Sequence, residues 1–146
     1  MLLRGMLISV AIGLSAVAAI AQTDPILARQ DLMKQNNDNA RAVVMMMRGR
    51  VPYDPAKVEQ AFAQWADTAQ KLPGLFPENS KTGHDTNALP AIWQNKSDFD
   101  AQAAAFGKAV AENRAKAIAS LDGLKAAIGV VGAACDNCHK DYRAPD

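Results

Sequence analysis

The sequence predicts an all-α protein, an antiparallel four-helix bundle, and two observations lead to that prediction. From residue 22 onward there are 24 Ala residues against 15 Val, Ile and Thr residues together. Alanine is the best helix former, whereas β-branched residues favour strands. Proline and glycine also divide this part of the chain into four stretches in which apolar residues recur every three or four positions. A chain of 146 residues has room for one compact domain.

Residues 1–21 precede that domain and have the features of a secretory signal peptide. Arg4 supplies the positive start, an uncharged apolar run follows, and Ala19-Ile20-Ala21 has the small-x-small form of a cleavage site. We expect a mature domain of residues 22–146 that is exported. An uncleaved membrane anchor is the alternative, because the apolar run approaches the roughly 20 residues that a membrane span needs.

The charges of the chain are balanced, with 16 Lys and Arg residues against 15 Asp and Glu residues. Removal of the leader with Arg4 makes the two numbers equal. A broad nucleic-acid surface needs clustered, unpaired basic residues, so a nucleic-acid partner is not expected. Two cysteines are too few for a disulfide-rich scaffold, yet thiols in an exported protein must be bonded to something or be oxidised.

The first two helices are marked by proline at their starts. The first is predicted from Pro25 to about Arg48, and the second opens at Asp54-Pro55, an N-cap acid before a proline. The methionines Met45–Met47 are expected to be core. The stripe predicted for the first helix is Ile26, Gln30, Met33, Asn37, Ala40, Val44 and Met47, with ordinary core in its second half. The face predicted for the second helix is Val58, Phe62, Trp65, Ala69 and Leu72.

The last two helices follow a 24-residue stretch from Pro73 to Lys96, and a stretch of that length is usually functional or covers something. The third helix is predicted to open at Ser97, with Asp100 completing a short capping box. The fourth begins near Leu121 and is predicted to reach the end of the chain. The other connections are short, which predicts antiparallel neighbours. The face of the third helix is Phe99, Ala103, Phe106, Val110 and Ala117. The seam of the fourth is Leu121, Leu124, Ile128, Val131, Cys135, Cys138 and Tyr142.

Both cysteines of the chain fall in one pentapeptide, Cys135-Asp136-Asn137-Cys138-His139. This is the signature of covalent c-type haem attachment. Helix positions three and four apart lie on one face, so both thiols are expected to point into the bundle and to bond one haem c. The imidazole of His139 then lies where it can bind the iron. The haem motif is therefore placed at the C-terminal end of the last helix.

Three other uses of the motif are open. A thioredoxin-like dithiol needs a lowered thiol pKa, which a helix C-terminus does not provide. A structural zinc site needs four ligands, and His84 in the long loop is the one candidate beyond the motif. The third alternative is that both cysteines are core packing residues without a chemical role, which is disfavoured because thiols in an exported protein become oxidised or bonded.

A haem motif at the end of the last helix of a bundle resembles the class II c-type cytochromes, the cytochrome c′ family. The resemblance extends along the whole chain after residue 21. Its further matches are Arg29-Gln30-Asp31-Leu32-Met33-Lys34, Pro52-Tyr53-Asp54, Leu72-Pro73-Gly74-Leu75-Phe76-Pro77, Ala91-Ile92-Trp93 and Arg143.

The resemblance implies that the residue four positions after Arg29, which is Met33, faces the open side of the iron. The context Leu32-Met33-Lys34 is similar to the cytochrome c-556 branch, in which methionine ligates and the iron is low-spin. That implies an electron carrier with His139 and Met33 as axial ligands. The alternatives are a five-coordinate cytochrome c′ that binds nitric oxide or carbon monoxide, and Met33 as gap-filling core. Gln30 and Asn37 beside Met33 favour a cofactor there, since polar groups on a seam need partners.

Other residues are assigned roles from the family or from their positions in the sequence. Arg29 and Gln30 are expected to pair with a haem propionate, with a solvated surface position as the alternative for Arg29. Arg143 is expected to screen the iron ligand or a propionate, or to be a favourable charge at a helix C-terminus. The remaining candidates are expected to be two packing aromatics and one solvated loop residue: Tyr53, Trp93 and His84.

Taken together, the resemblance implies a monohaem, non-enzymatic electron-transfer protein of the periplasm. Its partners would be redox proteins that the sequence does not identify, with no stable membrane insertion once the leader is removed. The family includes dimers formed through the first two helices as well as monomers. A haem-free or zinc-bound interaction module is the third hypothesis.

Overall fold

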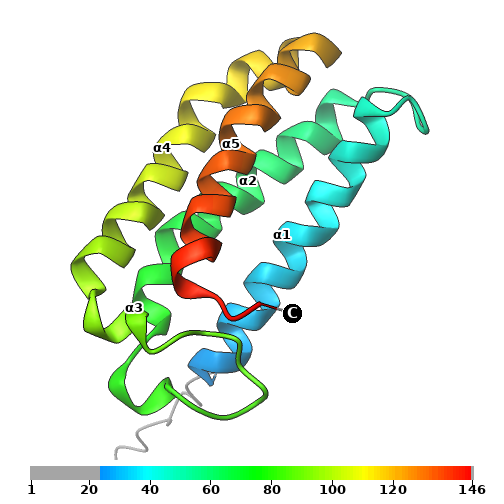
Figure 1. Ribbon diagram of the computed structural model, residues 1–146. Helices are drawn as coiled ribbons and strands as arrows, with labels where there is room; N and C mark the ends of the chain where they lie inside the picture. The colour runs from blue at the N-terminus through cyan, green and yellow to red at the C-terminus, as the bar shows by residue number, and fades with distance from the viewer. Residues whose placement is uncertain (1–23, 146) are drawn as a thin grey trace, which may run out of the picture.

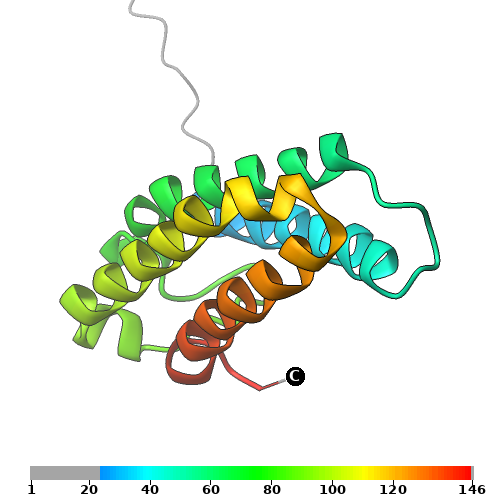
Figure 2. The same ribbon diagram turned by 90° about the horizontal axis from the view of Figure 1, so that it is seen from above.

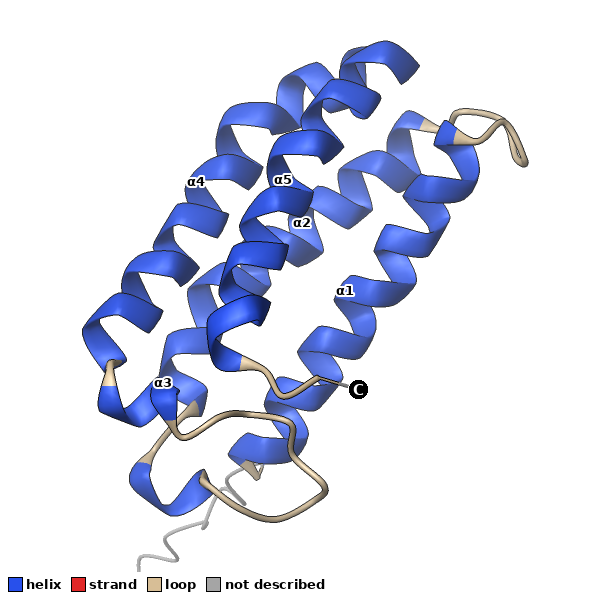
Figure 3. Cartoon of the chain, in the orientation of Figure 1, coloured by secondary structure: helices blue, strands red, loops and turns tan. Residues whose placement is uncertain are grey.

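The computed structural model describes residues 24–145, in which four long helices form an antiparallel bundle (Figure 1). Within these residues there is no strand (Figure 3), and no helix has the length and apolar character needed to cross a membrane. The predicted all-α bundle is confirmed, whereas the predicted signal peptide, residues 1–21, lies outside the described residues. The four long helices are α1 (Pro25–Met47), α2 (Pro55–Lys71), α4 (Lys96–Ala119) and α5 (Leu121–Tyr142).

The first two helices begin as the sequence predicts. A carboxylate oxygen of Asp24 accepts the backbone N–H of Ile26 at 2.7 Å, and one of Asp54 accepts that of Ala56 at 2.9 Å. A proline follows each capping aspartate, where its missing N–H costs nothing and its fixed φ suits the helix. Both starts are therefore fixed by local sequence.

The predicted capping box at Ser97 and Asp100 is wrong. Helix α4 begins one residue earlier, at Lys96, and its N-cap residue, Asn95, makes no side-chain capping bond. Asp100 is instead paired with Lys96 one turn before it. Because Ser97 lies inside the helix and not at its N-cap, the predicted box cannot form.

Helices α4 and α5 are joined by one residue, Ser120, which has extended backbone angles. Its hydroxyl oxygen accepts the backbone N–H of Gly123 at 3.0 Å and so caps α5. The turn is so tight that a Cβ at Gly123 would lie 2.1 Å from the backbone oxygen of Lys116. The predicted short connection is confirmed, and these two helices form the most extensive pair in the bundle.

The segment between α2 and α4, residues 72–95, is called the linking segment below. It contains three short helical pieces and crosses the end of the bundle between the start of α1 and the end of α5 (Figure 2). The backbone N–H of Leu89 donates to the backbone oxygen of Tyr142 at 3.0 Å, and the backbone N–H of Ala144 donates to the backbone oxygen of Asn87 at 2.8 Å. The chain after Tyr142 is therefore extended, which corrects the prediction that the last helix reaches the chain end. The short pieces are η1 (Leu72–Leu75), η2 (Glu78–Ser80) and α3 (Ala91–Gln94).

The core has two parts. A larger cluster fills the bundle between α1, α2, α4 and α5, and a smaller one lies beneath the linking segment. The faces predicted for α2 and α4 are confirmed: every predicted position is buried except Ala69, which is half-buried. The smaller cluster consists of Leu72, Phe76, Ile92, Phe99 and Tyr142.

The prediction for the first helix needs correction. Its fully buried face is turned toward α2 and the linking segment and differs from the predicted stripe. Met45, expected to be core, is 43% exposed, while Met46 is buried and Met47 half-buried. The predicted stripe is mostly half-buried, with Asn37 exposed, and much of it lines a cavity. The buried face is Ile26, Arg29, Leu32, Val43 and Met46, and the stripe residues that line the cavity are Met33, Asn37, Ala40 and Val44.

Candidate haem site

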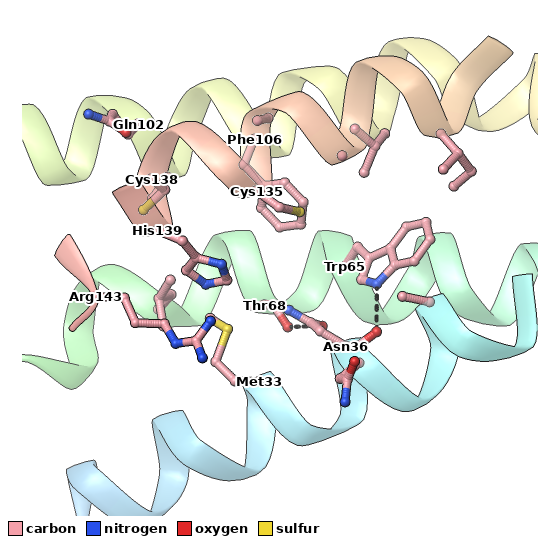
Figure 4. A pocket seen from close by; sticks show the side chains of 18 of the residues that line it. Met33, Asn36, Trp65, Thr68, Gln102, Phe106, Cys135, Cys138, His139 and Arg143 are labelled. Carbon is pink, nitrogen blue, oxygen red and sulfur yellow. Dashed lines mark hydrogen bonds between the residues drawn. The ribbon is translucent and has the colours of Figure 1, made fainter. Parts of the chain in front are cut away.

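A cavity of about 730 Å³ lies among the four long helices. Its volume falls within the range of small-molecule and cofactor sites, roughly 300–1,000 Å³. Its wall is mostly apolar and includes a few polar side chains. The side chains that line it include Met33, Trp65, Phe106, Cys135, Cys138 and His139 (Figure 4).

The predicted haem motif lies in the last two turns of α5 and faces this cavity. Cys135, Cys138 and His139 all line it, as helix positions three and four apart require. Each of the three is half-buried, and neither cysteine is in a disulfide. Both thiols and one imidazole are thus available at a single wall of the cavity.

The two thiols have raised pKa values. Burial, helped by the carboxylate of Asp136 and by Cys138, raises the pKa of Cys135 to about 11. Burial and the carboxylates of Asp141 and Asp98 also raise the pKa of Cys138. A thioredoxin-like dithiol works through a thiolate of lowered pKa, so the environment of this pair argues against that alternative.

The surroundings of His139 favour its neutral form. Burial lowers the pKa of His139, the charge of Arg143 lowers it further, and Asp136 opposes the change. A neutral imidazole has a free ring nitrogen, which is the form that binds a metal. The surroundings of His139 therefore suit an axial ligand.

Met33 enters the cavity from the opposite side. It lies on α1, and in Figure 4 its side chain and that of His139 point toward one another across the space between α1 and α5. Arg143 also lines the cavity, at the cap position of α5, where its backbone N–H donates to the backbone oxygen of His139 at 3.1 Å. The structure thus brings together the predicted attachment, iron-ligand and Arg143 positions.

Arg29 is not a solvated surface residue. Only 4% of it is exposed, and its guanidinium donates four hydrogen bonds to the linking segment, at 2.9–3.1 Å. Gln30 donates to the backbone oxygen of His84 at 2.7 Å. Both residues border a smaller cavity of about 240 Å³ that shares Met33 and His139 with the larger one. They lie next to the site, but their hydrogen bonds go to the chain itself.

The zinc alternative finds no support. Within residues 24–145, no three His, Cys, Asp or Glu side chains are close enough together to hold a metal ion. His84, the candidate fourth ligand, is exposed in the linking segment with its Nε2 3.4 Å from Asp24. Tyr53 and Trp93 line neither cavity, in agreement with their prediction as packing residues.

Several residues that shape the site were not predicted from the sequence. Thr68 is completely buried on α2, and its hydroxyl donates to the side-chain oxygen of Asn36 at 2.9 Å. The indole N–H of Trp65 donates to the backbone oxygen of Asn36 at 3.4 Å. The sequence signal that could have indicated this hydrogen bonding was a threonine on the apolar face of α2. On α4, Gln102 donates to Asp98 and to an acid on α5, and so ties the two helices together beside the motif.

The cavity fits a covalently attached haem in its size, its apolar wall and its donor set. Two thiols and a neutral imidazole stand on one helix, and a thioether stands opposite on another. Soft sulfur and imidazole donors suit haem iron, and an apolar wall suits the porphyrin ring. Cys135 and Cys138 would hold the ring, with His139 against the metal.

Comparison with known proteins leads to the same family. The family described as cytochrome C′ matches residues 24–143. A cytochrome c′ of Rhodopseudomonas palustris is 44% identical over 129 residues, which cover 86% of each chain. A cytochrome c-556 of the same organism is 38% identical over 146 residues, which cover 97% of each.

Solved structures agree with the sequence comparisons. The structure of cytochrome c′ from Rhodopseudomonas palustris has a TM-score of 0.80 at 40% identity and covers 86% of this chain and 99% of its own. A structure of oxidized cytochrome c556 from that organism has a TM-score of 0.78 at 37% identity, with the same coverage. Relatives of both kinds are thus similar to this chain over nearly the whole described region.

Proposed function

Because this chain belongs to the cytochrome c′ family of haem c proteins, we propose that it is an electron carrier with six-coordinate, low-spin iron. His139 is one axial ligand and Met33 is the other. Cys135 and Cys138 attach the haem through two thioether bonds. The observation that carries the proposal is the placement of Met33 and His139 on opposite walls of one cavity (Figure 4).

Each residue has a physical task in this function. The bound haem supplies an iron that gains and loses one electron. Neutral His139 donates a nitrogen lone pair, and the thioether of Met33 is a soft ligand that favours the reduced state. Trp65, Phe106 and the other apolar side chains exclude water from the iron, which limits the solvent rearrangement that accompanies a change of charge. A six-coordinate iron has no open position, so exogenous gases bind poorly.

A second candidate function is a five-coordinate gas-binding protein. One observation favours it: Met33 also packs against the smaller apolar cluster beneath the linking segment. A methionine held by that cluster could fill space without reaching the iron, and the 44% identical relative is named cytochrome c′. In either function no substrate is transformed, and we propose that the protein is not an enzyme. We place it in the periplasm, where it exchanges electrons with other redox proteins.

The spin state of the oxidised iron separates the two functions. We expect low-spin absorption and paramagnetic resonance spectra for the wild type and high-spin spectra for Met33→Leu. Met45→Leu, an exposed position on the same helix, is the matched control and should leave the spectra unchanged. High-spin iron in the wild type would contradict methionine ligation and favour the gas-binding function. Rapid carbon monoxide binding by the reduced wild type would do the same.

A further inference from the structure

Arg29 is a buried cation whose partners all lie in the linking segment. Its Nη1 donates to the Leu75 oxygen and to the Ser80 hydroxyl, each at 3.1 Å. Its Nη2 donates to the Ser80 backbone oxygen and to the Thr86 hydroxyl, each at 2.9 Å. The guanidinium also stacks over the ring of Phe76, 4.5 Å from its centroid. The planar guanidinium has several N–H donors in a fixed arrangement and can bond to these separate acceptors at once, whereas the compact ammonium group of a lysine cannot.

The acceptors are themselves fixed in place. Ser80 is 1% exposed, and its hydroxyl donates to the Pro77 oxygen at 2.9 Å. The Thr86 hydroxyl oxygen also accepts the N–H of Ala88 at 3.3 Å. Arg29 thus joins Leu75 to Thr86, eleven positions further along the linking segment, and holds this stretch to the start of α1.

The same segment is fastened to α5 at its other end. Leu89 and Asn87 make backbone hydrogen bonds with Tyr142 and Ala144, at 3.0 and 2.8 Å. The linking segment therefore connects the part of α1 that carries Met33 to the part of α5 that carries His139. Contacts between α1 and α5 themselves are sparse, because the cavity lies between them.

We propose that Arg29 is a positioning residue for the axial thioether: by anchoring the linking segment to α1, it sets the separation between Met33 and His139. The inference rests on the proposed methionine ligation. It differs from the propionate contact that family resemblance implies, because both Nη atoms already bond to the chain. An iron–thioether bond demands placement within about 0.5 Å, and Met33 lies one turn beyond Arg29.

Three haem-loaded variants and one control test the proposal. Arg29→Met removes every donor, and Arg29→Lys keeps the charge but loses the fork. The double variant Ser80→Ala/Thr86→Val leaves Arg29 intact and removes two of its acceptors. Arg41→Met changes an exposed arginine on the same helix. Absorption and paramagnetic resonance spectra of the oxidised proteins give the ratio of high-spin to low-spin iron.

We expect that ratio to rise about tenfold or more in all three variants and to stay at the wild-type value in Arg41→Met. A rise in Arg29→Met that Arg29→Lys reverses, with no change in the acceptor variant, would show a simple charge effect and overturn the proposal. Unchanged spectra in all variants would also overturn it. If Arg29→Met does not fold, the acceptor variant decides.

A high-spin wild type would contradict the proposed function by itself, and amide hydrogen exchange then decides the anchoring. Exchange in residues 75–90 that is about tenfold faster in Arg29→Met than in the wild type supports the anchoring role. Equal exchange in the two proteins overturns it.

Discussion

The tight turn between α4 and α5 predicts opposite effects for two glycine-to-alanine changes in one helix. In Gly123→Ala the new methyl group would lie 2.1 Å from the backbone oxygen of Lys116, where ordinary contact begins at 3.4 Å. The obstacle is backbone and cannot rotate away. Gly129 lies in the exposed middle of α5, and a methyl group there meets nothing within 4 Å.

The magnitudes follow from these two environments. Alanine in a helix interior is favoured over glycine, so Gly129→Ala should stabilise the protein by about 0.5–1 kcal/mol. Gly123→Ala must push α4 and α5 apart at their shortest connection, and overpacking of this kind costs roughly 1–3 kcal/mol. We therefore expect the two variants to differ by about 1.5–4 kcal/mol in free energy of unfolding.

Urea unfolding of the haem-loaded proteins, followed by far-ultraviolet circular dichroism, measures that difference. Neither glycine lines the larger cavity, so the spectrum of the iron should be unchanged in both variants. Gly123→Ala as stable as Gly129→Ala would contradict a cost of the close approach to Lys116. So would two variants that are destabilised equally.

Three further predictions concern hydrogen bonds and haem attachment. Tyr53→Phe removes a hydroxyl that donates to the last carbonyls of α4 at 2.7–2.8 Å and should lower the free energy of unfolding by about 1 kcal/mol. Burial raises the pKa of Tyr53, so this deficit should be full below about pH 10 and disappear at higher pH; a constant deficit contradicts it. The double variant Cys135→Ser/Cys138→Ser should lose all haem staining on a denaturing gel, whereas each single variant should keep it through the remaining bond. The hydroxyl of Tyr142 donates to Asp98 at 2.5 Å, which raises the pKa of Tyr142 to about 12 and lowers that of Asp98. In urea titrations, Tyr142→Phe should lose most free energy of unfolding relative to the wild type between about pH 5 and 10, because the bond needs a protonated hydroxyl and an ionised carboxylate. A loss that does not change with pH would count against the bond.

The fold and the attachment site were predictable because their signals are local. The capping pair Asp54-Pro55 and the three-and-four spacing of α2 and α4 act within one helix. The two thiols and His139 lie within five consecutive residues, so helix geometry alone places them on one face. Signals of this range survive in a single sequence.

The rest depended on contacts between distant parts of the chain. The partners of Arg29 are 46 to 57 positions away, and no spacing rule shows that a surface-type residue will be enclosed by a loop. The buried face of α1 was misjudged for a related reason: the helix packs on one side and lines a cavity on the other, so it has two inward faces. A single stripe of residues cannot describe such a helix.

The division of the site between two helices has a consequence for its chemistry. Three of the four bonds proposed to hold the prosthetic group originate from one short stretch of α5, and α1 contributes a single, weaker bond. A local opening of α1 would therefore change the colour and reactivity of the metal without any loss of pigment. Such an opening is reversible, because the covalently tethered ring keeps its position and the Met33 sulfur can bind the metal again when α1 closes.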